Sequence, residues 1–348
     1  METLLTLFGS ENFAQFDEYF KDTFKIIYPI AIRIICKNLN NNESLYKMMC
    51  RAASDESPSD YPFLFRFSYQ LGGKPFNKVH RIAAAIHLLQ TSTFVTDDIF
   101  DNSKKRGGRK TIHNVYGINN AIITAELLQT ISLNTIYSEI MKNSFPHSKI
   151  VFSLFNEFLE DVYIGQYLDI YQSGKNDVSL DSYSKMIALT TGKFLSNLSR
   201  AGSLLANLPK LHVESLSNYG FYYGMALQIC DDIIDVIYDS SLTMKSFACD
   251  IKCRRLRIPL ILALNLSRNK DHDTLIQLVA RQNRLSLNEI KSTINIIKEC
   301  GAIDECKRIA CQYILKAVEA LSKVKNTFPK KMLEYLALGL LRNIGGIE

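Results

Sequence analysis

The stretches HLLQTSTFVTDDIFD, at residues 87–101, and FYYGMALQICDDIID, at residues 221–235, each run from a largely apolar segment into three aspartates. Residues four apart share one face of an α-helix, so Asp97 lies beside Asp101, and the second stretch repeats that pair. Paired carboxylates repel each other unless a cation bridges them, and hard oxygen ligands of this kind favour Mg²⁺. Acids at the C-terminal end of a helix also oppose the helix dipole, which bound metal compensates. The alternative is two solvated acidic turns on the surface, and the apolar residues before each motif argue against it.

The rest of the chain favours an all-α fold. Gly and Pro contribute only 16 and 8 of 348 residues, whereas their combined share in average proteins is about 12%. The hydrophobic content of 47% excludes a disordered chain. No strand pair or hairpin is expected. Helical periodicity predicts helices over residues 13–36, 78–103, 118–143, 149–173, 180–206 and 211–238, with shorter ones to about 343 and polar breaks at 37–44 and 54–61.

These helices predict one large bundle with a central active-site cavity. We expect a single domain over residues 1–348, with an N-terminal helical segment at 1–60 and the catalytic core at 61–348. No apolar run reaches the 18 or so residues of a membrane span, and the N-terminus carries no secretory signal. The eight cysteines form no C-x-x-C pair, which argues against structural zinc and favours reduced thiols. A cytoplasmic protein is therefore expected.

A basic segment follows each acidic motif. These segments are KKRGGRK at residues 104–110 and KCRRLR at residues 252–257. Carboxylates, metal and cations together suit a diphosphate, because metal bridges its oxygens while Arg and Lys neutralise the remaining charge. The first segment also fits a nuclear-import or nucleic-acid patch. It lacks interleaved aromatic residues, however, and adjoins an acidic triplet, so no nucleic-acid partner is expected.

Four segments resemble motifs of the trans-isoprenyl diphosphate synthases, specifically of the geranylgeranyl type. They are DDIFDNSKKRGG at 97–108, GQYLDIY at 165–171, ALQICDDIID at 226–235 and KSFACD at 245–250. The resemblance implies the isoprenoid-synthase helical fold, a homodimer and Mg²⁺ as the cofactor. It also implies an allylic prenyl diphosphate as substrate, whose diphosphate leaves under the influence of metal and cations.

The resemblance further implies a role for each candidate site residue. The catalytic acidic residues would be Asp97, Asp98, Asp101, Asp231, Asp232 and Asp235. The metal ligands would be Asp97, Asp98, Asp101, Asp169, Asp231 and Asp235. The substrate diphosphate would contact Lys74, Arg106, Gln166, Gln228, Lys245 and Arg255. The prenyl pocket would be lined by Ser92, Thr93, Phe94 and Thr191, and the small residues there suggest room for a chain as long as geranylgeranyl.

The chain departs from the family pattern where a second substrate, isopentenyl diphosphate, would bind. The family's G-G-K-x-x-R appears as GGKPFN at residues 72–77, so Asn77 replaces an arginine, and Gly107 replaces the second arginine of R-R-G. On the allylic side, Thr190 stands where the family's K-T-G has lysine, which weakens that site as well. At the acceptor site, two arginines are lost. Each lost charge-assisted hydrogen bond is worth about 1.5–3 kcal/mol, so the acceptor site is expected to be weak.

Three hypotheses follow. The leading one is a terpene synthase derived from a prenyl diphosphate synthase, as in insects, which ionises farnesyl or geranylgeranyl diphosphate and cyclises or quenches the cation. The first alternative is a geranylgeranyl or polyprenyl diphosphate synthase that condenses isopentenyl diphosphate with an allylic diphosphate. In that case nearby cations such as Lys78, Lys105 or Arg109 would substitute in part for the lost arginines. The second alternative is a non-catalytic subunit of a heteromeric synthase, against which the intact acidic motifs argue.

Overall fold

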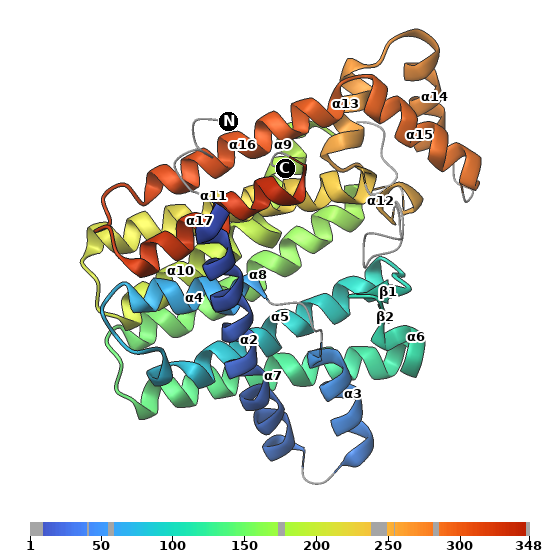
Figure 1. Cartoon of the computed structure of the whole chain (residues 1–348). Coiled ribbons are helices and arrows are strands. Elements are labelled where there is room, and N and C mark those ends of the chain that lie inside the picture. The colour runs from blue at the N-terminus through green and yellow to red at the C-terminus, as the bar shows by residue number, and fades with distance from the viewer. Residues whose placement is uncertain are drawn as a thin grey trace.

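A computed structural model describes residues 10–39, 42–54, 59–172, 178–237, 249–253, 255–280 and 285–345. The all-α fold class is confirmed, since most of this part of the chain is helical (Figure 1). Their bounds are α2 (Ser10–Asn38), α3 (Glu43–Ala53), α4 (Asp60–Gln70), α5 (His80–Phe100), α6 (Ile112–Tyr116), α7 (Ile118–Lys142), α8 (Ser148–Gln172), α9 (Leu180–Ile187), α10 (Lys193–Leu205), α11 (Lys210–Ile237), α12 (Cys249–Lys252), α13 (Ile258–Leu266), α14 (Asn269–Ala280), α15 (Leu287–Glu299), α16 (Ala302–Ala320) and α17 (Phe328–Asn343).

The centre of the bundle is built around α5 and α11, the two helices that end in the acidic motifs. Residues Ile82 to Leu89 of α5 are buried on every face, as expected of a helix surrounded by others. Helix α7 runs alongside α5, α10 runs alongside α11, and α2 crosses α5 and α7 at a steep angle (Figure 1). One apolar core joins residues from Phe13 in α2 to Ile344 after α17. The division at residue 60 stays a prediction.

Helix α11 approaches its neighbours closely through two glycines. A Cβ atom at Gly220 would lie 2.6 Å from Ser199 Oγ, and one at Gly224 would lie 2.8 Å from the Thr191 carbonyl oxygen. Both distances are too short for any larger side chain, so Gly220 sets the spacing between α11 and α10, and Gly224 sets that between α11 and the turn at Ala188–Gly192. They thereby fix how far the second acidic motif projects into the bundle.

Two local elements differ from the prediction. Residues Lys105–Arg106 (β1) and Arg109–Lys110 (β2) form a short antiparallel pair, although no hairpin was expected. The turn residues Gly107 and Gly108 both have positive φ, 56° and 76°, which is the conformation that makes Gly-Gly a hairpin signal. The helix expected over 180–206 is interrupted by a π-helical turn at Ala188–Gly192 (η2), and a 3₁₀ turn (η1) spans Phe76–Lys78. In the described part of the chain, no helix is long and apolar enough to cross a membrane.

Candidate active site

A cavity of about 1140 Å³ lies where α5, α8 and α11 meet the β1–β2 hairpin. The helices bring to it carboxylates that are far apart in the sequence. All seven aspartates that the sequence predicted for the site line this cavity, together with Asp250, which follows the second motif. These are Asp97, Asp98, Asp101, Asp169, Asp231, Asp232 and Asp235.

The first acidic motif is held by an arginine from the hairpin. Arg106 Nη2 lies 2.9 Å from Asp97 Oδ2, and Arg106 Nε donates to Asp98 Oδ1 at 3.0 Å. The same guanidinium lies over the ring of Phe94, 4.5 Å from its centroid. The Gly-Gly turn thus positions Arg106 beside the aspartates and above the prospective prenyl pocket.

The second motif is organised around the buried Asp232. The Tyr183 hydroxyl of α9 donates to Asp232 Oδ2 at 2.6 Å, and Gln228 Nε2 donates to Oδ1 at 3.0 Å. Gln228 is itself oriented by Thr191, whose hydroxyl donates to Gln228 Oε1 at 3.0 Å. Burial raises the pKa of Asp232 to about 7, although Arg257 and these hydrogen bonds lower it.

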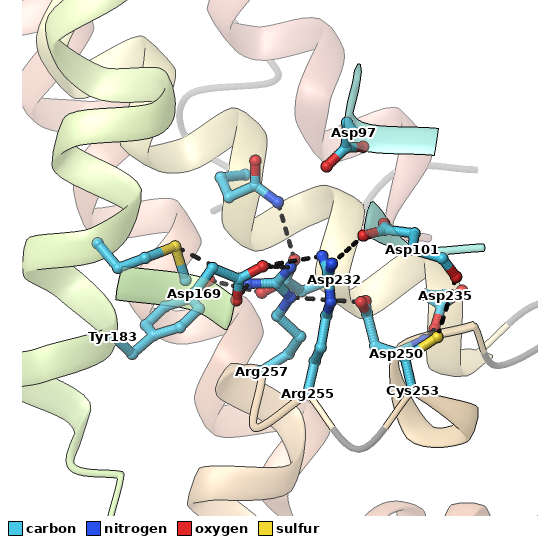
Figure 2. Close-up of polar contacts among 12 residues, drawn as sticks. Asp97, Asp101, Asp169, Tyr183, Asp232, Asp235, Asp250, Cys253, Arg255 and Arg257 are labelled. Carbon is cyan, nitrogen blue, oxygen red and sulfur yellow. Dashed lines mark hydrogen bonds and ion pairs between the residues drawn. The ribbon is translucent and has the colours of Figure 1, made fainter. Parts of the chain in front are cut away.

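Two arginines lie between the acidic segments, as Figure 2 shows. Arg255 pairs with Asp101 and, through Nη1 at 2.8 Å, with Asp169 Oδ2. Arg257 binds both oxygens of Asp169, with Nη1 and Nη2 at 2.8 and 3.1 Å, and its Nε lies 3.3 Å from Asp250 Oδ1. Burial raises the pKa of Asp101 to about 9, with a further contribution from Asp97 and against the effect of Arg255.

The donor set fits Mg²⁺ in its chemistry. All the clustered donors are carboxylate oxygens, and Mg²⁺ takes only one or two of these per ion when substrate phosphates complete its coordination. Burial raises the pKa values of Asp101 and Asp232 despite the nearby arginines, so further positive charge there would favour their ionised forms. Within the described ranges, three such groups do not converge on a single point. Phosphate oxygens would therefore have to supply the remaining ligands.

The other predicted residues divide into four groups by where the fold places them. Thr93, Phe94, Thr191, Gln166 and Gln228 line the cavity with the aspartates. Gln166 Nε2 is buried and has no hydrogen-bond partner in the described structure, so a donor is available to a ligand there. Ser92 is buried outside the cavity lining, where its hydroxyl donates to the Leu89 carbonyl. Lys245 lies outside the described residues.

Lys74 is the predicted residue that the fold carries away from the site. It is exposed in the turn between α4 and η1, just before the start of α5, whereas the aspartates lie at the other end of that helix. A helix of 21 residues spans about 30 Å. Gly72 in the same turn packs against Ala206, and Gly73 has a positive φ of 66°. The segment GGKPFN is thus a structural turn, and Asn77 says nothing about an anion site in the cavity.

Four cations that line the cavity come instead from α3 and the hairpin, and we call them the rim cations: Arg51, Lys105, Arg109 and Lys110. Arg109 Nη1 donates to the backbone carbonyl and the hydroxyl of Ser54, at 3.1 and 2.9 Å. Arg51 Nη2 donates to the Lys110 carbonyl at 3.2 Å. The sequence marked the basic run at 104–110, but nothing in it indicated that α3 would add Arg51.

Asp60 is a further cavity residue that the sequence did not indicate. It begins α4 and accepts a hydrogen bond of 2.6 Å from the Tyr223 hydroxyl of α11. Burial raises the pKa of Asp60 to about 6, against the effect of that bond and with a contribution from Asp231. The next residue, Tyr61, packs its ring 4.7 Å from Phe194, which extends the aromatic wall of the cavity.

Comparison with known proteins gives a consistent result. The polyprenyl synthetase family model matches residues 61–297. A geranylgeranyl diphosphate synthase of Sulfolobus acidocaldarius is 27% identical over 326 residues, covering 92% of this chain and 97% of that protein. A short chain isoprenyl diphosphate synthase of Methanocaldococcus jannaschii is 30% identical over 237 residues, covering 68% and 71%. The fold matches the crystal structure of geranylgeranyl pyrophosphate synthetase from Pyrococcus horikoshii, with a TM-score of 0.84, 23% identity, and coverage of 94% and 98%.

These comparisons overturn the leading functional hypothesis. A terpene synthase was expected, whereas the relatives are named geranylgeranyl or isoprenyl diphosphate synthases, which favours chain elongation. The error came from how two positions were interpreted. The hypothesis counted Asn77 as a lost acceptor-site arginine, but Asn77 follows Lys74 at the far end of α5. It also left out Arg51, which adds to the positive charge on the cavity wall.

Proposed function

Because this chain belongs to the polyprenyl synthetase family, we propose that it is a Mg²⁺-dependent prenyl diphosphate synthase, which joins isopentenyl diphosphate to an allylic prenyl diphosphate. The observation that carries this proposal is the cavity lined by both acidic motifs and by two separate groups of cations. Arg106 lies on the first motif and Arg257 between the motifs, whereas the rim cations come from α3 and the hairpin. Two groups of cations can bind two diphosphates, one from each substrate.

The first group would act on the allylic diphosphate. Mg²⁺, held by Asp97, Asp101, Asp231 and Asp235, would neutralise charge on the leaving diphosphate oxygens. Arg106 and the amide of Gln166, which line the cavity, would donate hydrogen bonds to those oxygens as the C1–O bond breaks and its electron pair leaves with the diphosphate. Arg255 was expected to contact the diphosphate, but it lies outside the cavity lining, where it pairs with Asp101 and Asp169.

The carbocation left at C1 lies against aromatic faces. Phe94, Tyr61 and Phe194 line the cavity next to the acidic end, where they exclude water and stabilise positive charge. The double bond of isopentenyl diphosphate supplies the electron pair for the new carbon–carbon bond. A proton then leaves C2 of that unit, its C–H pair forms the new double bond, and the departing diphosphate takes the proton.

The rim cations would hold the diphosphate of the acceptor. Arg51 and Arg109 are already fixed in place by carbonyl groups of the hairpin and of Ser54, so little side-chain freedom is lost on binding. Arginine forks match phosphate oxygens in geometry as well as charge, and Lys105 and Lys110 add positive charge beside them.

A homodimer is supported by an apolar stripe on α8. Tyr163, Ile164, Tyr167, Ile170 and Tyr171 follow the helical spacing of one face, and all are exposed, with Tyr167 at 63%. Ile118 and Ile122, at the start of the neighbouring helix α7, are exposed as well. Large contiguous apolar surface is rare on monomers, and a second copy of this chain is the partner that we propose.

The test is a product assay with purified protein and Mg²⁺. Geranyl, farnesyl or geranylgeranyl diphosphate is supplied with and without isopentenyl diphosphate, and both diphosphates and volatile products are analysed. We expect a longer diphosphate only when isopentenyl diphosphate is present, and none from Asp97→Ala. A product formed from the allylic substrate alone would refute the proposal, as would the absence of any product from folded protein.

The acceptor site is tested separately with Arg109→Met. Loss of one charge-assisted contact of about 1.5–3 kcal/mol predicts a KM for isopentenyl diphosphate raised about tenfold or more. The KM for the allylic substrate should change little. Arg308→Met on α16 is the control, because Arg308 lies on the surface and pairs only with Glu305 among the contacts described. An unchanged KM for isopentenyl diphosphate in Arg109→Met would exclude this residue from the acceptor site.

A further inference from the structure

We infer that Arg257 is a positioning residue whose guanidinium serves as a fixed counter-ion for Asp169 and Asp250, so that Asp169 does not bind a metal ion. The inference rests on the proposed function, because it concerns which carboxylates of that site remain available to Mg²⁺. It also reverses the role expected for Asp169 from the sequence.

The contacts of Arg257 use every nitrogen of its side chain. Nη1 and Nη2 engage the two oxygens of Asp169 in parallel, and Nε faces Asp250 (Figure 2). Arg255 Nη1 adds a second guanidinium to Asp169 Oδ2. Both oxygens of Asp169 are therefore already bound by nitrogen donors, and a metal ion there would have to displace a two-bond arginine contact.

The backbone fixes where this guanidinium lies. Arg257 is the N-cap residue of α13, and its carbonyl accepts hydrogen bonds from the amides of Leu260 and Ile261, both at 3.0 Å. Its own amide donates to the Arg255 carbonyl at 3.0 Å. The side chain is only 12% exposed, and that of Asp169 is 8% exposed. A buried arginine with an anchored backbone has few alternative positions, so it acts as a permanent part of the site.

The partner carboxylates connect Arg257 to the second acidic motif. The backbone amide of Asp250 donates to Asp235 Oδ2 at 3.2 Å, and the Asp250 carbonyl accepts from the Arg255 amide at 2.9 Å. By holding the Asp250 side chain, Arg257 keeps the start of α12 against Asp235. Removing the guanidinium would take the Arg257 contact from both carboxylates and leave Asp169 with Arg255 alone, which favours a divalent cation between them.

The experiment counts metal ions without turnover. Mn²⁺ replaces Mg²⁺, inorganic pyrophosphate replaces the substrate, and bound Mn²⁺ is measured by electron paramagnetic resonance. Arg257→Met should bind one Mn²⁺ more per chain than the wild type, whereas Arg257→Lys, which keeps the charge, should bind the wild-type number. Arg308→Met, which breaks a two-bond arginine pair on the surface, is the matched control and should also bind the wild-type number.

Asp169→Asn decides the question even if Arg257→Met fails to fold. If Asp169 is bound only by arginines, its replacement leaves the number of Mn²⁺ ions unchanged and their Kd within about twofold. Asp97→Asn, by contrast, should lose an ion. Loss of an ion or a Kd weakened about tenfold in Asp169→Asn would overturn the inference, as would a folded Arg257→Met with the wild-type count. Because no product is formed, these outcomes are independent of whether the chain elongates prenyl diphosphates.

Discussion

Replacing Tyr183 by phenylalanine removes a single hydroxyl from the base of the second acidic motif. The ring is buried, with 1% of its surface exposed, so Phe retains the packing. What is lost is the hydrogen bond to Asp232 Oδ2, after which Gln228 is the one remaining side-chain donor to this carboxylate among the bonds described.

The size of the loss depends on the charge of Asp232. A hydrogen bond to a charged group is worth about 1.5–3 kcal/mol, and one between neutral groups about 0.5–1.5 kcal/mol. Because the folded-state pKa of Asp232 is raised to about 7, its carboxyl is largely protonated at pH 6 and ionised at pH 8. Because the pKa of Asp232 is raised on folding, the free energy of unfolding falls as the pH rises through 7. The hydrogen bond from Tyr183 stabilises the ionised carboxylate and offsets part of this loss. Tyr183→Phe should therefore destabilise the fold by about 1 kcal/mol at pH 6 and about 2–3 kcal/mol at pH 8.

The assay is urea unfolding of the metal-free protein, followed by far-ultraviolet circular dichroism at both pH values. Tyr219→Phe is the matched control, because Tyr219 is equally buried and donates to a neutral acceptor, the Leu333 carbonyl. It should cost about 1 kcal/mol at either pH. If the two variants lose the same stability at pH 6 and at pH 8, the reasoning about Asp232 is refuted.

Three further predictions follow from the fold. Gly220→Ala should lower the free energy of unfolding by about 1–3 kcal/mol in denaturant titration. The new Cβ lies 2.6 Å from Ser199 Oγ and must push α11 away from α10. Wild-type stability in this variant would contradict the close packing. Asp60→Asn should raise the melting temperature more at pH 8 than at pH 5, because burial raises the pKa of Asp60 to about 6 and only the ionised form is costly; an equal change at both pH values counts against this. Ile164→Glu should convert a dimer to a monomer in size-exclusion chromatography with light scattering, since Ile164 is 53% exposed on the apolar stripe; an unchanged mass would exclude that face.

The sequence predicts the helices and the two acidic motifs well, because both depend on local spacing. Helical periodicity located α7 within one residue of its bounds, and the i, i+4 spacing put Asp97 and Asp101 on one face. Lys74 shows where such reasoning fails. A motif match compares residue types along the sequence. In the fold, helix α5 separates Lys74, just before its start, from the aspartates at its end.

Contacts between distant segments were beyond the sequence for the same reason. Arg257 and Asp169 are 88 positions apart, and Asp60 and Tyr223 are 163 apart, so no local pattern links them. The hairpin is a different case. Gly107-Gly108 is a recognisable turn signal, but the segment was interpreted only by its basic charge, so no hairpin was predicted. Function was misjudged because the cations of the cavity wall come partly from α3, whose Arg51 has no motif around it.

The wide separation of these partners has a consequence for the growing polypeptide. The cavity takes groups from α2 through α17, and the Tyr219 hydroxyl of α11 donates a hydrogen bond to the Leu333 carbonyl of α17. Contacts of such long sequence separation form late, after loop closure has been achieved across most of the chain. A ribosome-bound fragment that ends before α11 holds the first acidic motif without the second. On the proposed function, such a fragment would lack the carboxylates of the second motif and could not form the complete site.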